Sequence, residues 1–193
     1  MWLTRQGSKI TRMNYYGAKE LAEAFRTVRK NTLVVAEEID EKNYGFRAAP
    51  ETRTVAQTLI HIADAPKLQE HVHAVAKLKT LDGFDFMGFF APMMNQEQLP
   101  HTKLQILTLL NEQGEHFAHW LGSLSDSFLG EQVSMPAGMT PASKSRFEMI
   151  LGVKEHEMHH RAQLMLMQRM TGGVPHLTRQ MNERMAAMMK AKA

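Results

Sequence analysis

Two histidines one helical turn apart are the residues of this chain with the clearest capacity for chemistry. His156 and His160 stand at positions i and i+4, so a helix of about 3.6 residues per turn presents both on one face. A divalent metal ion needs unprotonated imidazole nitrogens at roughly 2.0–2.1 Å, and this spacing can supply two of them. The pair predicts a metal site if it lies in the protein interior and a third ligand joins it.

The residues around the pair indicate an interior position. Steps of three and four residues select a stripe that is apolar except for the two histidines, namely Met149, Val153, His156, His160, Leu164 and Met167. Such a stripe is typical of a buried helix face. A single histidine on this face is usually a hydrogen-bonded core residue, but two stacked rings both need partners in one small volume. The pattern therefore favours metal ligation over plain core packing.

A second apolar stripe supplies the expected third ligand. It consists of Thr58, His61, Ala65, Leu68, Val72 and Val75, in which His61 is the only ionisable residue. Three histidines from two buried faces leave at least one coordination position open, which is typical of catalytic rather than structural zinc sites. His71 and His73 point to different sides of a helix. His159 neighbours the pair but lies off its stripe, so we expect it at the surface or behind the ligands.

The composition describes a chain that can fold without covalent cross-links. Its 193 residues are 44% hydrophobic and include no cysteine, which excludes disulfides, thiolate ligands and a cysteine nucleophile. No apolar run follows the charged N-terminus, and no stretch approaches about 18 uninterrupted apolar residues. We therefore expect no signal peptide, no membrane partner, a cytoplasmic location and a single domain over residues 1–193.

The net charge of +3 comes from the C-terminal part of the chain, which has nine Lys/Arg and four Asp/Glu from Lys144 onward. A basic segment can attract anionic substrates or nucleic acid. These basic residues are spread along the segment without interleaved aromatic residues, unlike a surface that binds single strands. We interpret them as a solvated face and expect no nucleic-acid partner.

Four long amphipathic segments predict an all-α fold, most simply a four-helix bundle. They run from about Ala18 to Ile39, from near Thr54, from after Pro100, and from Ser143–Ser145 to Gly172-Gly173. Pro66 should interrupt the second helix and free the carbonyl of Ile62. The short loop after the first helix predicts that the first two helices are antiparallel neighbours. We find no convincing alternating strands.

Two further segments connect or follow these helices. The stretch from Leu81 to Pro100 is rich in phenylalanine, so we interpret it as a crossover that packs over the bundle. Its side chains either form a wall of the metal pocket or pack in the hydrophobic core. The tail, residues 178–193, predicts a short basic helix with methionines at helical spacing, which would pack on the bundle or on a second subunit.

The order and separation of these motifs resemble the DinB superfamily. The resemblance rests on the lone histidine within Thr54–Ile62, the His-x3-His within His156–Leu164, and the ending Gly172-Gly173-Val174-Pro175. It covers about residues 15–177. It implies an up-down-down-up four-helix bundle, frequent homodimerisation, and one divalent metal ion bound by His61, His156 and His160. Arg161 and Gln163 match the family's common continuation after the last histidine, but the resemblance gives them no chemical role.

The superfamily includes metal-dependent transferases that use low-molecular-weight thiols, so the leading hypothesis is an enzyme that transfers such a thiol to a small electrophilic substrate. The expected metal is zinc or nickel, since imidazole suits both. An open position on a tri-histidine ion could bind a thiol and favour its thiolate, which is the nucleophilic form. A chain without cysteine depends on an external thiol for this chemistry.

Two other functions remain open. The segment His156–His160 also satisfies H-E-x-x-H, in which Glu157 would be the general base of a metal-dependent hydrolase. However, the metzincin continuation needs glycine where Gln163 stands, and Glu157 lies roughly 100° around the helix from His156. We therefore expect Glu157 to face away from the metal and Glu157→Gln to leave the metal content largely intact. The third possibility is a non-catalytic metal-binding module of a stress response.

Overall fold

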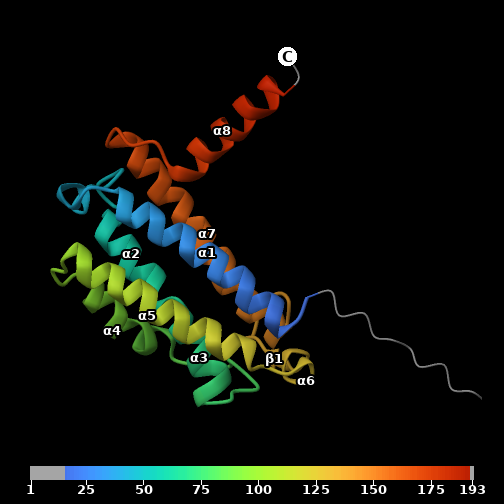
Figure 1. Ribbon diagram of the computed structural model, residues 1–193. Helices are drawn as coiled ribbons and strands as arrows, with labels where there is room; N and C mark the ends of the chain where they lie inside the picture. The colour runs from blue at the N-terminus through green and yellow to red at the C-terminus, as the bar shows by residue number, and fades with distance from the viewer. Residues whose placement is uncertain (1–15, 192–193) are drawn as a thin grey trace, which may run out of the picture.

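The computed structural model describes residues 16–191; residues 1–15, where we expect no signal peptide, and residues 192–193 lie outside the described part. Four long helices form a bundle (Figure 1): α1 (Ala18–Glu38), α2 (Val55–Asp64), α5 (Lys103–Gly122) and α7 (Arg146–Met170). The other elements are η1 (Glu41–Asn43), α3 (Pro66–Glu70), the π-helical turn η2 (His71–Val75), α4 (Phe86–Glu97), α6 (Asp126–Leu129), β1 (Gln132–Ser134), β2 (Ser143–Ser145) and α8 (His176–Lys190).

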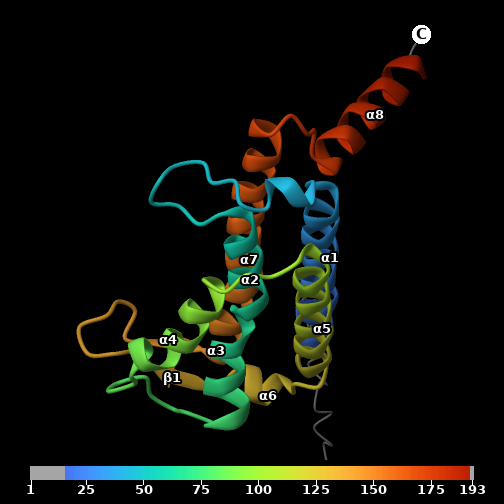
Figure 2. The ribbon, with the colours of Figure 1, turned by 90° about the vertical axis from the view of Figure 1, so that its left-hand side faces the viewer.

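The bundle has the up-down-down-up topology that the resemblance implies. In Figure 2, α1 and α7 run upward, whereas α2 and α5 run downward. Both α1 and α2 pack on α5 and α7, so α1 and α2 occupy opposite corners of the bundle. The two helices are antiparallel as predicted, but the prediction that they are neighbours was wrong. The connection from Ile39 to Thr54, which contains η1, is long enough to cross to the far corner.

Local sequence signals define where the bundle helices begin and end. Helices α2, α5 and α7 each start with a reciprocal capping box, in the pairs Thr54 with Gln57, Thr102 with Gln105, and Ser145 with Glu148. Helix α7 ends before Gly172, whose φ of 91° lies in the left-handed region that glycine adopts most easily. The predicted start near Ser143–Ser145 and the predicted stop at the two glycines are both confirmed.

A short antiparallel pair of strands precedes α7. Gln132 pairs with Ser145, and Ser134 pairs with Ser143. Val133, the central residue of β1, is fully buried in a small cluster with Val72 and Leu81. With three residues each, β1 and β2 are too short to show a recognisable alternation, which is why the sequence pattern did not reveal them.

The C-terminal helix α8 projects away from the bundle (Figures 1 and 2). The predicted short helix is confirmed, but its methionine stripe does not pack on the bundle. Four methionines remain 46–69% exposed, namely Met181, Met185, Met188 and Met189. Only the start of α8 is anchored, where the buried His176 hydrogen-bonds Asn31 at 3.1 Å. Within residues 16–191, no helix is both long and apolar enough to cross a membrane.

One buried arginine joins all four helices of the bundle. Arg29 on α1 is 4% exposed and donates from Nε and Nη2 to the carboxylate of Glu157 on α7, at 2.9–3.1 Å. Its Nη1 donates to the carbonyl of Leu110 on α5 at 2.6 Å, and its Nη2 to the carbonyl of Ile62 on α2 at 3.3 Å. Gly114 makes room for this side chain, because a Cβ there would lie 2.8 Å from Arg29 Cγ.

The hydrogen bond to Ile62 is connected with the interruption at Pro66. Helix α2 ends at Asp64 and α3 starts at Pro66, as predicted, because proline has no N–H to donate to the carbonyl four residues earlier. A buried carbonyl without a partner would destabilise the fold. The guanidinium of Arg29 supplies the missing donor.

The buried pair predicts that Glu157→Gln destabilises the protein. The substitution leaves the Arg29 charge without its counter-ion, which in a buried pair costs about 3–5 kcal/mol. For a chain of this size we expect the Tm to fall by roughly 10 °C. Thermal unfolding monitored by circular dichroism measures the change, with the exposed Glu155→Gln on the same helix as a control. Equal Tm values for the two variants would contradict the structural role of the pair.

Candidate metal centre

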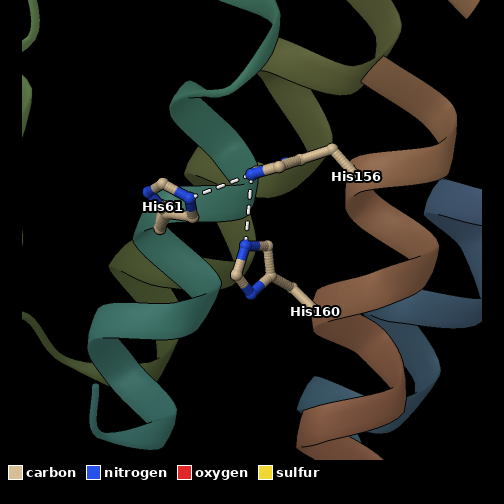
Figure 3. Close-up of side chains that lie close together, drawn as sticks. All are labelled: His61, His156 and His160. Atoms are coloured by element: carbon tan, nitrogen blue, oxygen red, sulfur yellow. Dashed lines mark hydrogen bonds between the residues drawn. The ribbon is translucent and has the colours of Figure 1, made fainter. Parts of the chain in front are cut away.

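The structure brings the three predicted histidines together between α2 and α7. Figure 3 shows their rings pointing toward one another. Nε2 of His156 lies 3.1 Å from Nε2 of His61 and 3.1 Å from Nε2 of His160, and the three nitrogens lie within 4.8 Å of one another. Two ligands at 2.0–2.1 Å from a tetrahedral ion are roughly 3.3 Å apart. The spacing is therefore close to that of a metal site.

The hydrogen bonds on the far sides of two rings determine which nitrogen carries a hydrogen. Nδ1 of His61 donates to Glu97 Oε1 at 2.8 Å, and Nδ1 of His160 donates to Gln163 Oε1 at 2.8 Å. A neutral imidazole with its hydrogen on Nδ1 has a lone pair on Nε2. Both rings therefore direct lone pairs toward the same small space.

The third ring, His156, completes a donor set that fits a cation. Its Nδ1 is buried and has no hydrogen-bond partner, so a single hydrogen on Nε2 could serve only one of its two neighbours. Burial, followed by the neighbouring His160 and His61, lowers the pKa of His156 to about 4. Burial also lowers the pKa of His160, although the hydrogen bond with Gln163 opposes this shift. Both rings are thus neutral near pH 7, which is the form that binds a metal ion.

Glu97, at the end of α4, is a site residue that sequence reasoning missed. Its side chain is 6% exposed, and its second oxygen accepts from Arg53 Nε at 2.7 Å. Burial raises the pKa of Glu97, but the hydrogen bonds from His61 and Arg53 outweigh it and hold the pKa below its usual value. A carboxylate behind a histidine fixes the orientation of the ring and makes it a better ligand. The crossover thus contributes directly to the site, as one of its two interpretations proposed.

The residues that follow the histidine pair have separate roles. Gln163 holds His160 and also contacts His159 Nε2 at 3.1 Å. Arg161 points toward α1, where its Nη1 donates to the carbonyl of Val28 at 3.2 Å. Glu157 is 1% exposed and its carboxylate is bound by Arg29, so it faces α1 rather than the three histidines. Gln163 lies three residues after His160, and this spacing is the signal that could have identified it.

Two pockets border the histidines and share Arg53, Met94 and Glu97. One, of about 860 Å³, touches His160 and is lined mainly by polar residues, such as Gln57, Asn95, Gln98 and Gln163, although apolar atoms make up more than half of its wall. The other, of about 510 Å³, touches His61 and His156 and is largely apolar. Its apolar lining includes Leu68, Met87, Phe90, Met93, Met149 and Val153. The three ring nitrogens can therefore be approached from a polar side and from an apolar side.

This geometry predicts that the purified protein holds about one divalent ion per chain. His61→Ala, His156→Ala and His160→Ala should each lose most of it, because the remaining two nitrogens form a weak site. Plasma mass spectrometry of the desalted proteins measures the metal content, and His119→Ala, an exposed histidine on α5, serves as the control. Full metal retention by all three ligand variants would refute the site.

Comparisons with known proteins identify the family of this chain. The family model of the DinB superfamily matches residues 24–164. The comparison with curated proteins found no match. Among solved structures, YfiT from Bacillus subtilis aligns with 89% of this chain and 94% of its own, at a TM-score of 0.64 and 14% identity. YfiT is described as a probable metal-dependent hydrolase with an unusual four-helix bundle topology. With a family match that spans most of its length, the chain belongs to the DinB superfamily.

Proposed function

We propose that this protein is a metal-dependent enzyme that transfers a low-molecular-weight thiol to a small electrophile, with the ion held by His61, His156 and His160. The observation that carries the proposal is the convergence of three histidine ring nitrogens beside two pockets, one lined mainly by polar residues and one by apolar residues. A divalent ion at this position lowers the pKa of a thiol or a water that binds to it. Zinc and nickel are the expected ions, because both accept imidazole ligands.

The residues around the histidines have positioning roles in this proposal. Glu97 and Gln163 hold two of the rings in the orientation that binds the ion. The amide side chains of the polar pocket can hydrogen-bond a polar thiol, whereas the apolar pocket excludes water from an electrophilic carbon. The sulfur must come from outside the protein, since the chain contains no cysteine.

The transfer is a substitution in which a carbon–sulfur bond replaces the bond between carbon and a leaving group. The leaving group departs with the bonding electron pair, and the thiol proton passes to solvent. The protein contributes by holding the two reactants next to each other in adjacent pockets, which removes much of the entropic barrier to their encounter. We place the enzyme in the cytoplasm, where small thiols are kept reduced.

A metal-dependent hydrolase is the second candidate, favoured by the description of YfiT. In that reaction water replaces the thiol, and a general base is needed to take its proton. Glu157 is unsuitable, because Arg29 binds its carboxylate, and Glu97 already accepts from His61 and Arg53. Neither of these two carboxylates is therefore free to act as that base. A protein that binds the metal without turnover is the third candidate.

A direct assay separates the three candidates. Zinc- or nickel-loaded protein is incubated with 1-chloro-2,4-dinitrobenzene and, in turn, with glutathione, coenzyme A, mycothiol or bacillithiol. We expect at least one thiol to give thioether faster than without protein, and His160→Ala but not His119→Ala to abolish the gain. Cleavage of aryl esters that needs the same histidines but no thiol would instead support the hydrolase. Metal binding without either reaction would support the non-catalytic module.

We also propose that the chain forms a homodimer through the methionine stripe of α8. These side chains are exposed along one helix and methionine adapts to irregular apolar contacts. We expect light scattering at micromolar concentration to give about twice the 22.0 kDa chain mass. Replacing Met185 and Met188 together with lysine should return the mass to one chain, whereas Gln180→Lys on the same helix should not. A wild-type mass near one chain that does not change with concentration would refute the dimer.

A further inference from the structure

One glycine in α7 has no structural reason to be there. Four glycines lie within the helices of residues 16–191: Gly88, Gly114, Gly122 and Gly152. A Cβ on Gly88 would collide with the helix cap Asp85, and one on Gly114 would collide with Arg29, whereas one on Gly122 would make an ordinary contact of 3.8 Å with the Cβ of Ala22. A Cβ on Gly152 would meet nothing within 4 Å. Glycine inside a helix is destabilising relative to alanine, so packing does not account for Gly152.

The position of Gly152 connects it with the metal centre. It precedes His156 by four residues, so the two occupy the same face of α7. It also lies in the wall of the apolar pocket, together with Met149 and Val153. The missing side chain therefore leaves space in a pocket whose wall also includes His156.

The lining of this pocket indicates what can occupy it. Most of its side chains are methionine, phenylalanine, leucine and valine. Apart from the histidines, its charged side chains lie in ion pairs, Asp64 with Lys67 Nζ at 2.6 Å and Arg53 with Glu97 at 2.7 Å, although the buried carboxylate of Asp64 has no hydrogen-bond partner. A charged ligand in the apolar part of the pocket, away from the metal position, would lose its hydration and find few polar groups to replace it. The pocket therefore fits an uncharged, apolar molecule.

We propose that Gly152 sets the size limit for an uncharged apolar electrophile that binds in this pocket. The inference rests on the proposed function in identifying the ligand as the thiol acceptor, but binding itself needs no turnover. Methionines in the lining, such as Met87 and Met93, can change rotamer to accommodate different shapes. The backbone at Gly152 cannot move in this way, because it belongs to the longest helix of the bundle. The pocket therefore accepts ligands of different shapes, as long as they are no wider than the space beside Gly152.

Binding of the neutral fluorescent probe N-phenyl-1-naphthylamine to the metal-loaded protein tests this inference. The series Gly152→Ala, Gly152→Leu and Gly152→Phe fills the pocket in steps, and Glu155→Leu adds the same apolar side chain at an exposed position of α7. We expect saturable binding to the wild type and a graded loss that reaches at least roughly tenfold in Kd for Gly152→Leu. The metal content should be unchanged, and the Tm of Gly152→Ala should equal or exceed that of the wild type.

Each other outcome overturns the proposal. An unchanged Kd along the series would mean that the probe does not occupy this pocket, and an equal loss in Glu155→Leu would mean that the effect is not steric. A lower Tm for Gly152→Ala would mean that packing requires the glycine. Failure of the thiol-transfer assay leaves these binding results intact, so the two proposals fail separately.

Discussion

The guanidinium of Arg29 has to be neutralised and hydrogen-bonded inside the bundle, and this requirement constrains all four long helices. A buried charge without partners is strongly destabilising, so Glu157, Leu110 and Ile62 must be in position at the same time. The pair also sets the rotation of α7. Because Glu157 faces α1, the preceding residue His156 is turned by about 100° and faces α2, where His61 lies. A structural ion pair and a chemical site thus share one helix by using adjacent residues that point in different directions.

The site itself depends on polar contacts behind the rings as much as on the rings. Glu97 and Gln163 orient His61 and His160, and both contacts use the nitrogen that faces away from the metal position. Glu97 belongs to α4, a segment that crosses from one bundle helix to the next and also provides Phe90 and Met93 to the apolar pocket. The crossover therefore supplies both polar support for the site and an apolar wall, which an ideal four-helix bundle without this segment would lack.

The sequence predicted the parts of this structure that depend on local periodicity. From the i, i+4 spacing of His156 and His160 and the apolar stripe around His61, the sequence predicted that the three histidines lie together. Pro66 likewise predicted the break after α2. The sequence could not reveal Glu97, because its partner His61 is 36 residues away and α4 has no clear amphipathic pattern. The diagonal placement of α1 and α2 and the projection of α8 were missed for a similar reason. Both are set by packing between distant segments, on which periodicity within one helix carries no information.

The three histidine rings differ in how firmly they are held, because Nδ1 of His156 has no hydrogen-bond partner. Hydrogen bonds to Glu97 and Gln163 fix the orientation of the His61 and His160 rings. The ring of His156 has no hydrogen bond on Nδ1, so packing and the two neighbouring rings alone set its orientation. If an ion bound here, the direction of the His156 nitrogen could change without the loss of a hydrogen bond behind a ring. The three histidines would then discriminate less between metals of different coordination geometry, and the supply of metals would contribute more to which ion is bound.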